Sequence, residues 1–170
     1  MKYNKIFILG GIGSGKTTLA NKLSKILKIK NFELDDIAYK KREAYEKQNP
    51  KARDKKLKVI LKRKKWIIEG FYSRPWIHPI YKKADIIIIL NIELSISKRR
   101  IIKRFLKRKL SFKKEKRFNE KLKSNLNLLK STGEYPKYFK IQKETAKRFN
   151  KNTLILKNNK EINDFIKNLK

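Results

Sequence analysis

Near its start the chain reads Gly10-Gly11-Ile12-Gly13-Ser14-Gly15-Lys16-Thr17. This segment matches in full the pattern G-x-x-x-x-G-K-S/T, the P-loop, whose glycines let successive backbone N–H groups surround phosphate oxygens. In this pattern the lysine reaches the β- and γ-phosphates of a nucleotide, and the hydroxyl after it can bind Mg²⁺. The segment therefore predicts a site for ATP and Mg²⁺, whose nucleotide-binding residues are Gly10, Gly11, Ile12, Gly13, Ser14, Gly15, Lys16, Thr17 and Thr18.

The residues on either side of the motif have the patterns that a P-loop requires. Tyr3–Leu9 is a short apolar run, which predicts a buried strand, and from Thr17 to Lys28 apolar residues recur at helical spacing. A helix in this position directs the positive end of its dipole at the bound phosphate. The alternative, a glycine-rich hairpin that matches by chance, does not account for the strand and the helix.

Farther along the chain, short apolar runs alternate with amphipathic segments. The runs predict strands at Asn31–Leu34, Trp66–Glu69, Ile86–Leu90 and Thr153–Leu156. The amphipathic segments predict helices from Pro50 to about Lys64, from about Leu94, over Arg117–Lys130, from Pro136 to about Phe149 and over Glu161–Leu169. This alternation predicts an α/β fold, a P-loop NTPase three-layer sandwich with a five-stranded parallel sheet and helices on both faces. We expect one domain over residues 1–170.

The composition excludes several classes of site. The 170 residues include no cysteine and a single histidine, which rules out disulfides, zinc–thiolate and iron–sulfur centres, multi-histidine metal sites and a Ser-His-Asp triad within the chain. We expect this histidine, His78, in a turn or at the surface, because it lies between Pro75 and Pro79. The longest apolar run, Ile86–Leu90, is far shorter than the roughly 20 residues that cross a membrane, and no signal peptide is recognisable. We therefore expect a cytoplasmic protein with no membrane partner.

The chain is strongly basic, with 48 Lys and Arg against 15 Asp and Glu and a formal net charge of +33. Such a charge attracts polyanions, with a steep dependence on salt concentration, and makes nucleic acid a candidate partner through the basic surface. Lysines greatly outnumber arginines, however, whereas surfaces that read nucleic acid rely on arginine for bidentate contacts. A compositional bias therefore explains the charge as well as a nucleic-acid partner does.

Two aspartates follow the second predicted strand, in the segment Glu33-Leu34-Asp35-Asp36. The carboxyl ends of the strands in a doubly wound sheet face the ligand crevice. A carboxylate there can take a proton from an attacking hydroxyl or orient the acceptor of a transferred group. We predict that Asp35 is catalytic and binds the acceptor substrate. The alternative is that both aspartates only cap the segment that follows.

The third predicted strand begins the segment Trp66-Ile67-Ile68-Glu69-Gly70-Phe71-Tyr72-Ser73-Arg74. An acid at the end of a strand beside a P-loop can hold Mg²⁺ through water, and an arginine a few residues later can clamp a phosphate. We therefore predict Thr17 and, through water, Glu69 as metal-binding residues, and Arg74 as a residue that binds the acceptor. The alternative is a surface turn with an exposed ion pair.

A basic segment follows the fourth predicted strand. Lys98–Arg117 holds twelve basic residues against one acid. Arg100, Arg104 and Arg108 are four residues apart and so share one face of a helix, where their charges repel unless an anion lies among them. In a kinase this anion is the transferring phosphoryl group, so we predict an arginine-rich helical lid at about 98–118, with Arg100 and Arg104 as catalytic residues. A solvated basic face is the alternative.

These motifs, in this order, resemble the small P-loop kinases of the adenylate-kinase-like superfamily, most closely the DNA topology modulation proteins. Those proteins combine a P-loop with a His-Leu-Asp segment like Glu33-Leu34-Asp35, a Trp-Ile-Ile-Asp-Gly-Asn-Tyr-Ser-Arg segment like Trp66–Arg74, and an Ala-Asp strand with an arginine-rich helix like Ala84–Leu110. Adenylate kinases are similar more loosely, through an Asp-Gly-Phe-Pro-Arg segment near Glu69-Gly70-Phe71 and Arg74. The resemblance covers roughly the first two thirds of the chain.

The resemblance implies roles for several residues already singled out. By this likeness Lys16 and Thr17 bind MgATP, Glu69 supports Mg²⁺, and Arg100 and Arg104 belong to the lid. The acceptor is not implied, because the name of the family refers to DNA, whereas its motifs are those of phosphoryl transfer to a small acceptor.

The chain also departs from the pattern of these kinases. Asn91 follows the fourth strand where they often have aspartate, so we expect no metal ligand there. Glu69 replaces their usual aspartate, a longer side chain that should keep a role through water, and no proline lies between Phe71 and Arg74. The loop Lys157–Asn159 follows the last strand, where such kinases usually contact the base.

Together these features predict an ATP-dependent phosphotransferase that moves the γ-phosphoryl group of MgATP to a small-molecule or nucleotide acceptor near Asp35 and Arg74. Lys16, Mg²⁺ and the lid residues Arg100 and Arg104 would neutralise the charge of the transferring group. The alternatives are a nucleotide-dependent nucleic-acid-binding protein, as the DNA topology modulation likeness suggests, or a nucleic-acid 5′-hydroxyl kinase. The sequence leaves open the acceptor, the choice between ATP and GTP, and the oligomeric state.

Overall fold

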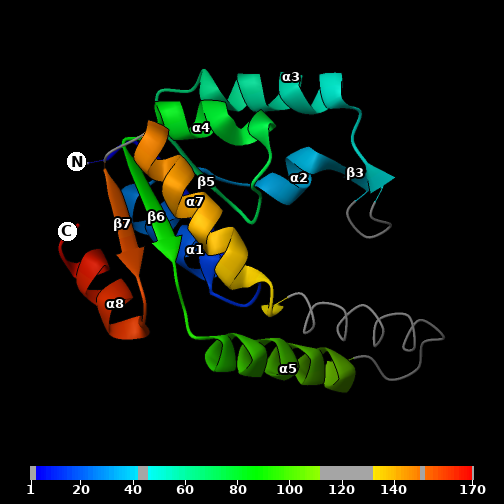
Figure 1. The fold of residues 1–170 in the computed structure, drawn as a ribbon, viewed down its shortest axis with the longest axis vertical. Coiled ribbons are helices and arrows are strands. Elements are labelled where there is room, and N and C mark those ends of the chain that lie inside the picture. The colour runs from blue at the N-terminus through cyan, green and yellow to red at the C-terminus, as the bar shows by residue number, and fades with distance from the viewer. Residues whose placement is uncertain (1–2, 42–45, 112–131, 150–151, 170) are drawn as a thin grey trace.

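A five-stranded parallel sheet forms the centre of the protein, as the sequence predicts. The computed structural model describes residues 3–41, 46–111, 132–149 and 152–169 (Figure 1). The strand order in the sheet is β2-β5-β1-β6-β7, and all neighbours are parallel. The strands are β1 (Lys5–Gly10), β2 (Asn31–Glu33), β5 (Trp66–Gly70), β6 (Ile86–Leu90) and β7 (Thr153–Leu156).

Helices cover both faces of this sheet, which gives the predicted three layers (Figure 1). Side chains of α1 and α8 pack against one face, and those of α3, α4 and α7 pack against the other. The five helices are α1 (Lys16–Leu27), α3 (Pro50–Leu61), α4 (His78–Lys83), α7 (Tyr135–Phe149) and α8 (Asn159–Lys167). The sheet is therefore buried on both sides, and ligands can reach it at the ends of its strands.

The strand sequences explain this burial. Every residue of Ile86–Leu90 is buried, and successive residues alternate between the two hydrophobic clusters that flank the sheet. In the central strand, Phe7 and Leu9 face the side of α3, α4 and α7, whereas Ile6 and Ile8 face α1. A run of β-branched residues suits a parallel strand that is covered on both faces.

The structure differs from the predicted elements around the second strand. That strand ends at Glu33, one residue before the predicted Leu34, and Leu34–Ala38 forms a short helix, α2, so Asp35 lies in its first turn. A two-stranded hairpin follows, with β3 (Tyr39–Lys41) and β4 (Glu46–Lys47), which the sequence analysis did not predict. These strands are too short and too polar to give an alternating apolar pattern.

The segment after the third predicted strand is more ordered than a turn. A 3₁₀ turn, η1 (Pro75–Ile77), leads directly into α4, and Pro79 occupies an early helical position where its missing N–H costs nothing. His78, expected in a turn or at the surface, begins α4 and is half-buried, with its ring 5.0 Å from that of Phe149.

The predicted basic helix is α5 (Leu94–Ser111), which contains the first part of the predicted lid (Figure 1). The remainder of the lid and the predicted helix over Arg117–Lys130 lie outside the described residues. Within the described ranges, no helix is both long enough and apolar enough to cross a membrane.

Candidate active site

The P-loop connects β1 to α1 and has the backbone conformation that its glycines permit. Gly13 and Gly15 adopt positive φ angles of 77° and 99°, which side-chain-bearing residues rarely do. A Cβ at Gly13 would lie only 2.6 Å from the carbonyl oxygen of Ser97 in α5. Gly15 precedes the first turn of α1 and makes no side-chain cap, so the N–H groups of that turn suit an anion.

Lys16 lies inside the curve of this loop. Its Nζ atom donates a hydrogen bond to the carbonyl oxygen of Gly11 at 2.9 Å. Burial lowers the pKa of Lys16, and the carboxylates of Glu69 and Asp35 act in the opposite direction. The amine is thus held close to two acids at a point where a phosphate would supply further negative charge.

Thr17 and Glu69 form a pair beside the lysine. The Oγ1 atom of Thr17 donates to Oε1 of Glu69 at 2.6 Å, and Glu69 is only 3% exposed. Glu69 lies on β5, in register with Ile8 of the neighbouring β1, which brings its side chain to the start of α1. Burial raises the pKa of Glu69, while the hydrogen bond from Thr17 and the charge of Lys16 lower it.

The hydroxyl and carboxylate of this pair are the oxygen ligands that Mg²⁺ prefers. In the part of the chain that the structure describes, no group of three or more His, Cys, Asp or Glu side chains could hold a metal alone. Mg²⁺ commonly binds through one or two protein oxygens together with water and substrate phosphates, so the donors present fit this ion.

Asp35 lies in α2, where Tyr72 holds its carboxylate. The hydroxyl of Tyr72 donates to Oδ1 of Asp35 at 2.9 Å. Burial and the charge of Asp35 raise the pKa of Tyr72, so the phenol stays protonated and continues to donate. The ring of Tyr72 packs edge-on against Trp76 at 5.3 Å, and the guanidinium of Arg53 lies 4.7 Å from the Trp76 ring.

Arg74 lies in different surroundings from Arg100 and Arg104, the two arginines of the predicted lid. Arg74 is exposed at the start of η1, in the segment that carries Tyr72. Arg100 donates from Nη1 to the carbonyl oxygen of Ser14 at 2.8 Å and from Nη2 to Oδ1 of Asn159 at 2.9 Å. Arg104 is exposed one turn later, and its charge lowers the pKa of Lys16. The structure therefore brings both Arg100 and Arg104 to the P-loop side.

The sequence analysis did not identify Tyr135 as a residue that packs against the P-loop. Its ring packs on Gly11 so closely that a Cβ there would lie 2.9 Å from the ring, and its hydroxyl donates to the carbonyl oxygen of Leu90 at 2.9 Å. Burial raises the pKa of Tyr135, so the phenol remains a donor. Tyr135 begins α7, so this helix rests directly on the P-loop at its first residue, and the sequence carries no local signal of this contact.

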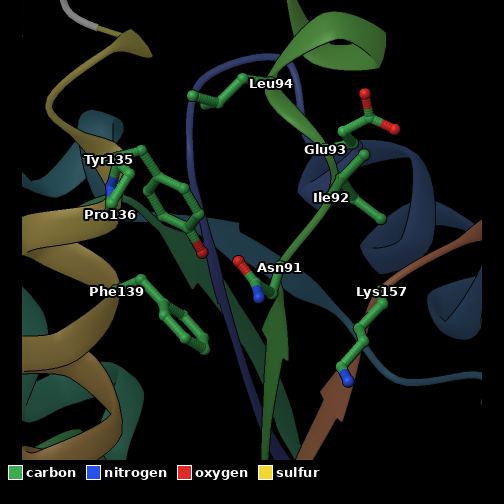
Figure 2. Close-up of a pocket in the computed structure, with 8 residues that line it drawn as sticks. All are labelled: Asn91, Ile92, Glu93, Leu94, Tyr135, Pro136, Phe139 and Lys157. Carbon is green, nitrogen blue, oxygen red and sulfur yellow. The ribbon is translucent and has the colours of Figure 1, made fainter.

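A pocket of about 450 Å³ lies on another side of Tyr135 (Figure 2). Figure 2 shows Tyr135 and Phe139 of α7 on one side, Lys157 on the other, and the connection between β6 and α5 between them. Its lining residues are Asn91, Ile92, Glu93, Leu94, Tyr135, Pro136, Phe139 and Lys157. None of the acids near Lys16 belongs to this lining.

Comparisons with known proteins identify the fold. No protein-family model matches the sequence, and no curated protein matches it. Solved structures do resemble it. A shikimate kinase from Acinetobacter baumannii, bound to shikimate, is 17% identical over 98% of this chain and 90% of its own, with a TM-score of 0.55. A deoxyadenosine kinase from M. mycoides, with bound dATP, is 18% identical over 98% of both chains, with a TM-score of 0.54.

A gluconokinase from Sinorhizobium meliloti is 13% identical over 98% of this chain and 95% of its own, with a TM-score of 0.50. At such identities the likeness shows the fold alone, and the fold is that of the P-loop kinases. The kinase part of the resemblance found in the sequence is therefore confirmed at the level of fold, and the closer likeness to DNA topology modulation proteins stays a prediction.

Proposed function

We propose that this protein is an ATP-dependent phosphotransferase that moves the γ-phosphoryl group of MgATP to an acceptor beside Asp35. The observation that carries the proposal is the assembly of Lys16, the Thr17–Glu69 pair and Asp35 around one complete P-loop. These groups come from three separate segments, and each has the chemistry that phosphoryl transfer requires. The P-loop kinase fold of the solved structures supports the same reaction class.

Residues Gly10–Thr18 would bind the phosphates of ATP through backbone N–H groups, with the amine of Lys16 on the β- and γ-phosphates. To do so, Lys16 must exchange its hydrogen bond with the Gly11 carbonyl for phosphate oxygens. Arg100 and Arg104 would add positive charge around the transferring group. The contact of Arg100 with Asn159 places this arginine beside the Lys157–Asn159 loop, where the base of the nucleotide is expected.

Thr17 and Glu69 would hold Mg²⁺, Thr17 by its hydroxyl and Glu69 through water. When bound, Mg²⁺ supplies positive charge to the phosphate oxygens. Glu69 keeps the Thr17 hydroxyl oriented toward the loop, and its burial excludes competing solvent contacts.

Asp35 would orient the acceptor and take the proton of its attacking group, while Tyr72 keeps the carboxylate in position. Arg74 would contact the acceptor from the exposed end of the same segment. Among the solved structures, the shikimate, deoxyadenosine and gluconate kinases are named for small acceptors, which favours a small acceptor here.

Calorimetric titration with MgATP at about 0.2 M salt tests the nucleotide site, because salt at this level screens exposed charges. We expect saturable binding at one site and its loss in Lys16→Ala. Lys22→Ala is the matched control, since Lys22 is an exposed lysine of the same helix and its removal changes the net charge equally. Equal binding heats in the two variants would mean that ATP is attracted by charge alone.

The net charge of +33 favours a second candidate, a nucleotide-dependent nucleic-acid-binding protein or a nucleic-acid 5′-hydroxyl kinase. On α5, Lys98, Arg99 and Lys103 are exposed and can contact phosphates. This candidate predicts oligonucleotide binding that responds to ATP and persists at about 0.2 M salt. Binding that disappears at this salt concentration and does not depend on ATP would mean that the positive charge only attracts polyanions in general.

A further inference from the structure

The pocket of about 450 Å³ beside Tyr135 has no part in the proposed phosphoryl transfer. Pockets that hold small molecules measure roughly 300–1,000 Å³, so this one has room for a ligand. Among the described residues that line it, none belongs to the P-loop, and neither Arg100 nor Asn159 is included. Lys157 alone is shared with the loop beside which the base of the nucleotide is expected. The lining is therefore largely distinct from the residues proposed to bind ATP.

One wall of the pocket is aromatic. Tyr135 and Phe139 lie one turn apart on α7, with their ring centroids 6.1 Å apart. Tyr135 is buried, and the hydrogen bond from its hydroxyl to the carbonyl oxygen of Leu90 fixes its ring. Pro136 and Leu94 add apolar surface around the rings. A wall of this kind packs well against a planar ring of a ligand.

The opposite side of the pocket carries two nitrogen donors. Asn91 follows β6, and its backbone N–H is bonded to the carbonyl oxygen of Leu156, which holds the residue at the pocket. Lys157 follows β7, and its backbone N–H is bonded to the carboxylate of Glu161. Figure 2 shows the amide of Asn91 between the ring of Tyr135 and the amine of Lys157. An amide N–H and an ammonium group together suit a carboxylate.

The two acids nearest to these donors have hydrogen-bond partners of their own. Glu93 lines the pocket, but its Oε1 atom accepts from the hydroxyl of Ser95, and Figure 2 shows its carboxylate pointing away from both rings. The carboxylate of Glu161 accepts from the backbone N–H of Lys157 and from the amide of Asn158. Two rings opposite two donors therefore favour a ligand with an acidic group at one end, and the net charge of +33 attracts such anions.

We propose that this pocket is a binding site for a small aromatic acid, a planar ring that carries a carboxylate, and that the site is separate from the P-loop. The ring packs against Tyr135 and Phe139, and the carboxylate accepts hydrogen bonds from Lys157 and Asn91. This inference goes beyond the proposed function and does not depend on phosphoryl transfer. Because Tyr135 also packs on Gly11, a ligand here contacts a side chain that supports the P-loop.

Fluorine NMR of para-trifluoromethylbenzoate with the full chain tests the site. At about 0.2 M salt, which screens exposed charges, we expect saturable line broadening with a Kd of about 1 mM or below. The neutral probe para-trifluoromethylbenzamide has the same ring and should bind about fivefold more weakly or worse. Equal binding of the two probes would overturn the proposal, because the carboxylate would then make no specific contact.

Lys157→Gln tests the contact of the carboxylate. We expect the Kd for the benzoate probe to rise about tenfold, because a charged hydrogen bond is lost. Lys160→Gln is the matched control, since Lys160 is an exposed lysine of α8 and its removal changes the net charge equally. Equal weakening in the two variants would overturn the proposal in favour of attraction by charge alone.

Phe139→Leu tests the aromatic wall while keeping an apolar side chain. Both probes should bind about fivefold more weakly, because the contact between two rings is lost. Phe165→Leu is the control, since Phe165 is a half-buried phenylalanine of α8 that does not line the pocket. Probe binding that is unchanged in Phe139→Leu would place the ring elsewhere and overturn the proposal.

The last arm adds MgATP at the concentration that saturates the calorimetric titration. The benzoate probe should stay bound, because its contacts do not overlap those of the phosphates. Complete displacement of the probe would place it in the nucleotide site and overturn the proposal. If the titration shows no ATP binding, the proposed function fails, and the comparison of Lys157→Gln with Lys160→Gln still decides this inference.

Discussion

The two sides of the candidate site have opposite electrostatic character. On the nucleotide side, Lys16, Arg100 and Arg104 surround the P-loop, and the first turn of α1 points its N–H groups at the same place. On the proposed acceptor side, Asp35 accepts a hydrogen bond from Tyr72, whose ring packs against Trp76. The comparison teaches that a net charge of +33 does not describe the site, because the fold brings Glu69 and Asp35, two of the few acids, close enough to act on the P-loop lysine.

Glu69 lies between the two sides, and its replacement should lower the rate of transfer strongly. In Glu69→Gln the proposed Mg²⁺ would lose its water-mediated carboxylate, and Thr17 loses its charged acceptor. We expect kcat to fall about 100-fold and the Mg²⁺ concentration for half-maximal rate to rise. Steady-state kinetics over a Mg²⁺ series measures both. Glu93→Gln, an exposed acid, is the control, and an unchanged Mg²⁺ dependence in Glu69→Gln would place the metal elsewhere.

Arg100 should affect ATP binding and the transfer step, and leave acceptor binding unchanged. Arg100→Gln loses charged hydrogen bonds to the P-loop and to Asn159, so we expect KM for ATP to rise about tenfold with KM for the acceptor unchanged. Arg99→Gln removes the same charge from the exposed neighbouring residue and should change neither constant. An equal rise in both Michaelis constants would show that the two sides are not separable.

Tyr72 provides the opposite test, on the acceptor side. Tyr72→Phe keeps the ring against Trp76 but removes the hydrogen bond to Asp35. We expect kcat/KM for the acceptor to fall about fivefold, with the dissociation constant for ATP unchanged. Tyr138→Phe, which removes a phenol from a ring that packs on Phe71, is the control. Weaker ATP binding in Tyr72→Phe would contradict the division into two sides.

The pH dependence of kcat/KM should reveal the ionisation of the buried carboxylate of Glu69, which lies between the two sides of the site. Because burial raises the pKa of Glu69 above 4.5, the fraction of ionised Glu69 falls at a higher pH than for an exposed glutamate. We therefore expect kcat/KM for ATP to decline on the acid side above pH 4.5. The rate profile between about pH 4 and 8 measures this decline. A profile that stays flat down to pH 4.5 would mean that ionised Glu69 is not required.

Local patterns in the sequence predicted the sheet and the P-loop because these elements carry their signals within a few residues. The run Ile86–Leu90 is a buried strand, and the Gly10–Thr17 motif joins a strand to a helix, as predicted. The start of α2 was not predicted, because Leu34 packs under Gly70, a residue far away in sequence.

Contacts between segments far apart in the chain account for the features of the candidate site that the sequence could not predict. Tyr72 reaches Asp35 across 37 residues, and Arg100 reaches Asn159 across 59. The sequence named Asp35 and Arg100 as site residues from their positions, but it held no signal for the side chains that orient them. Such partners depend on strand order and helix placement, which emerge only in the folded chain.

Transfer of labelled γ-phosphate from MgATP to an acceptor, compared between wild type, Lys16→Ala and Lys22→Ala at one salt concentration, tests the central claim most directly. Phosphotransfer through the P-loop predicts label on one acceptor class, retained in Lys22→Ala and reduced about 1,000-fold or more in Lys16→Ala. Equal transfer by both variants, or release of free phosphate with no acceptor labelled, would contradict it.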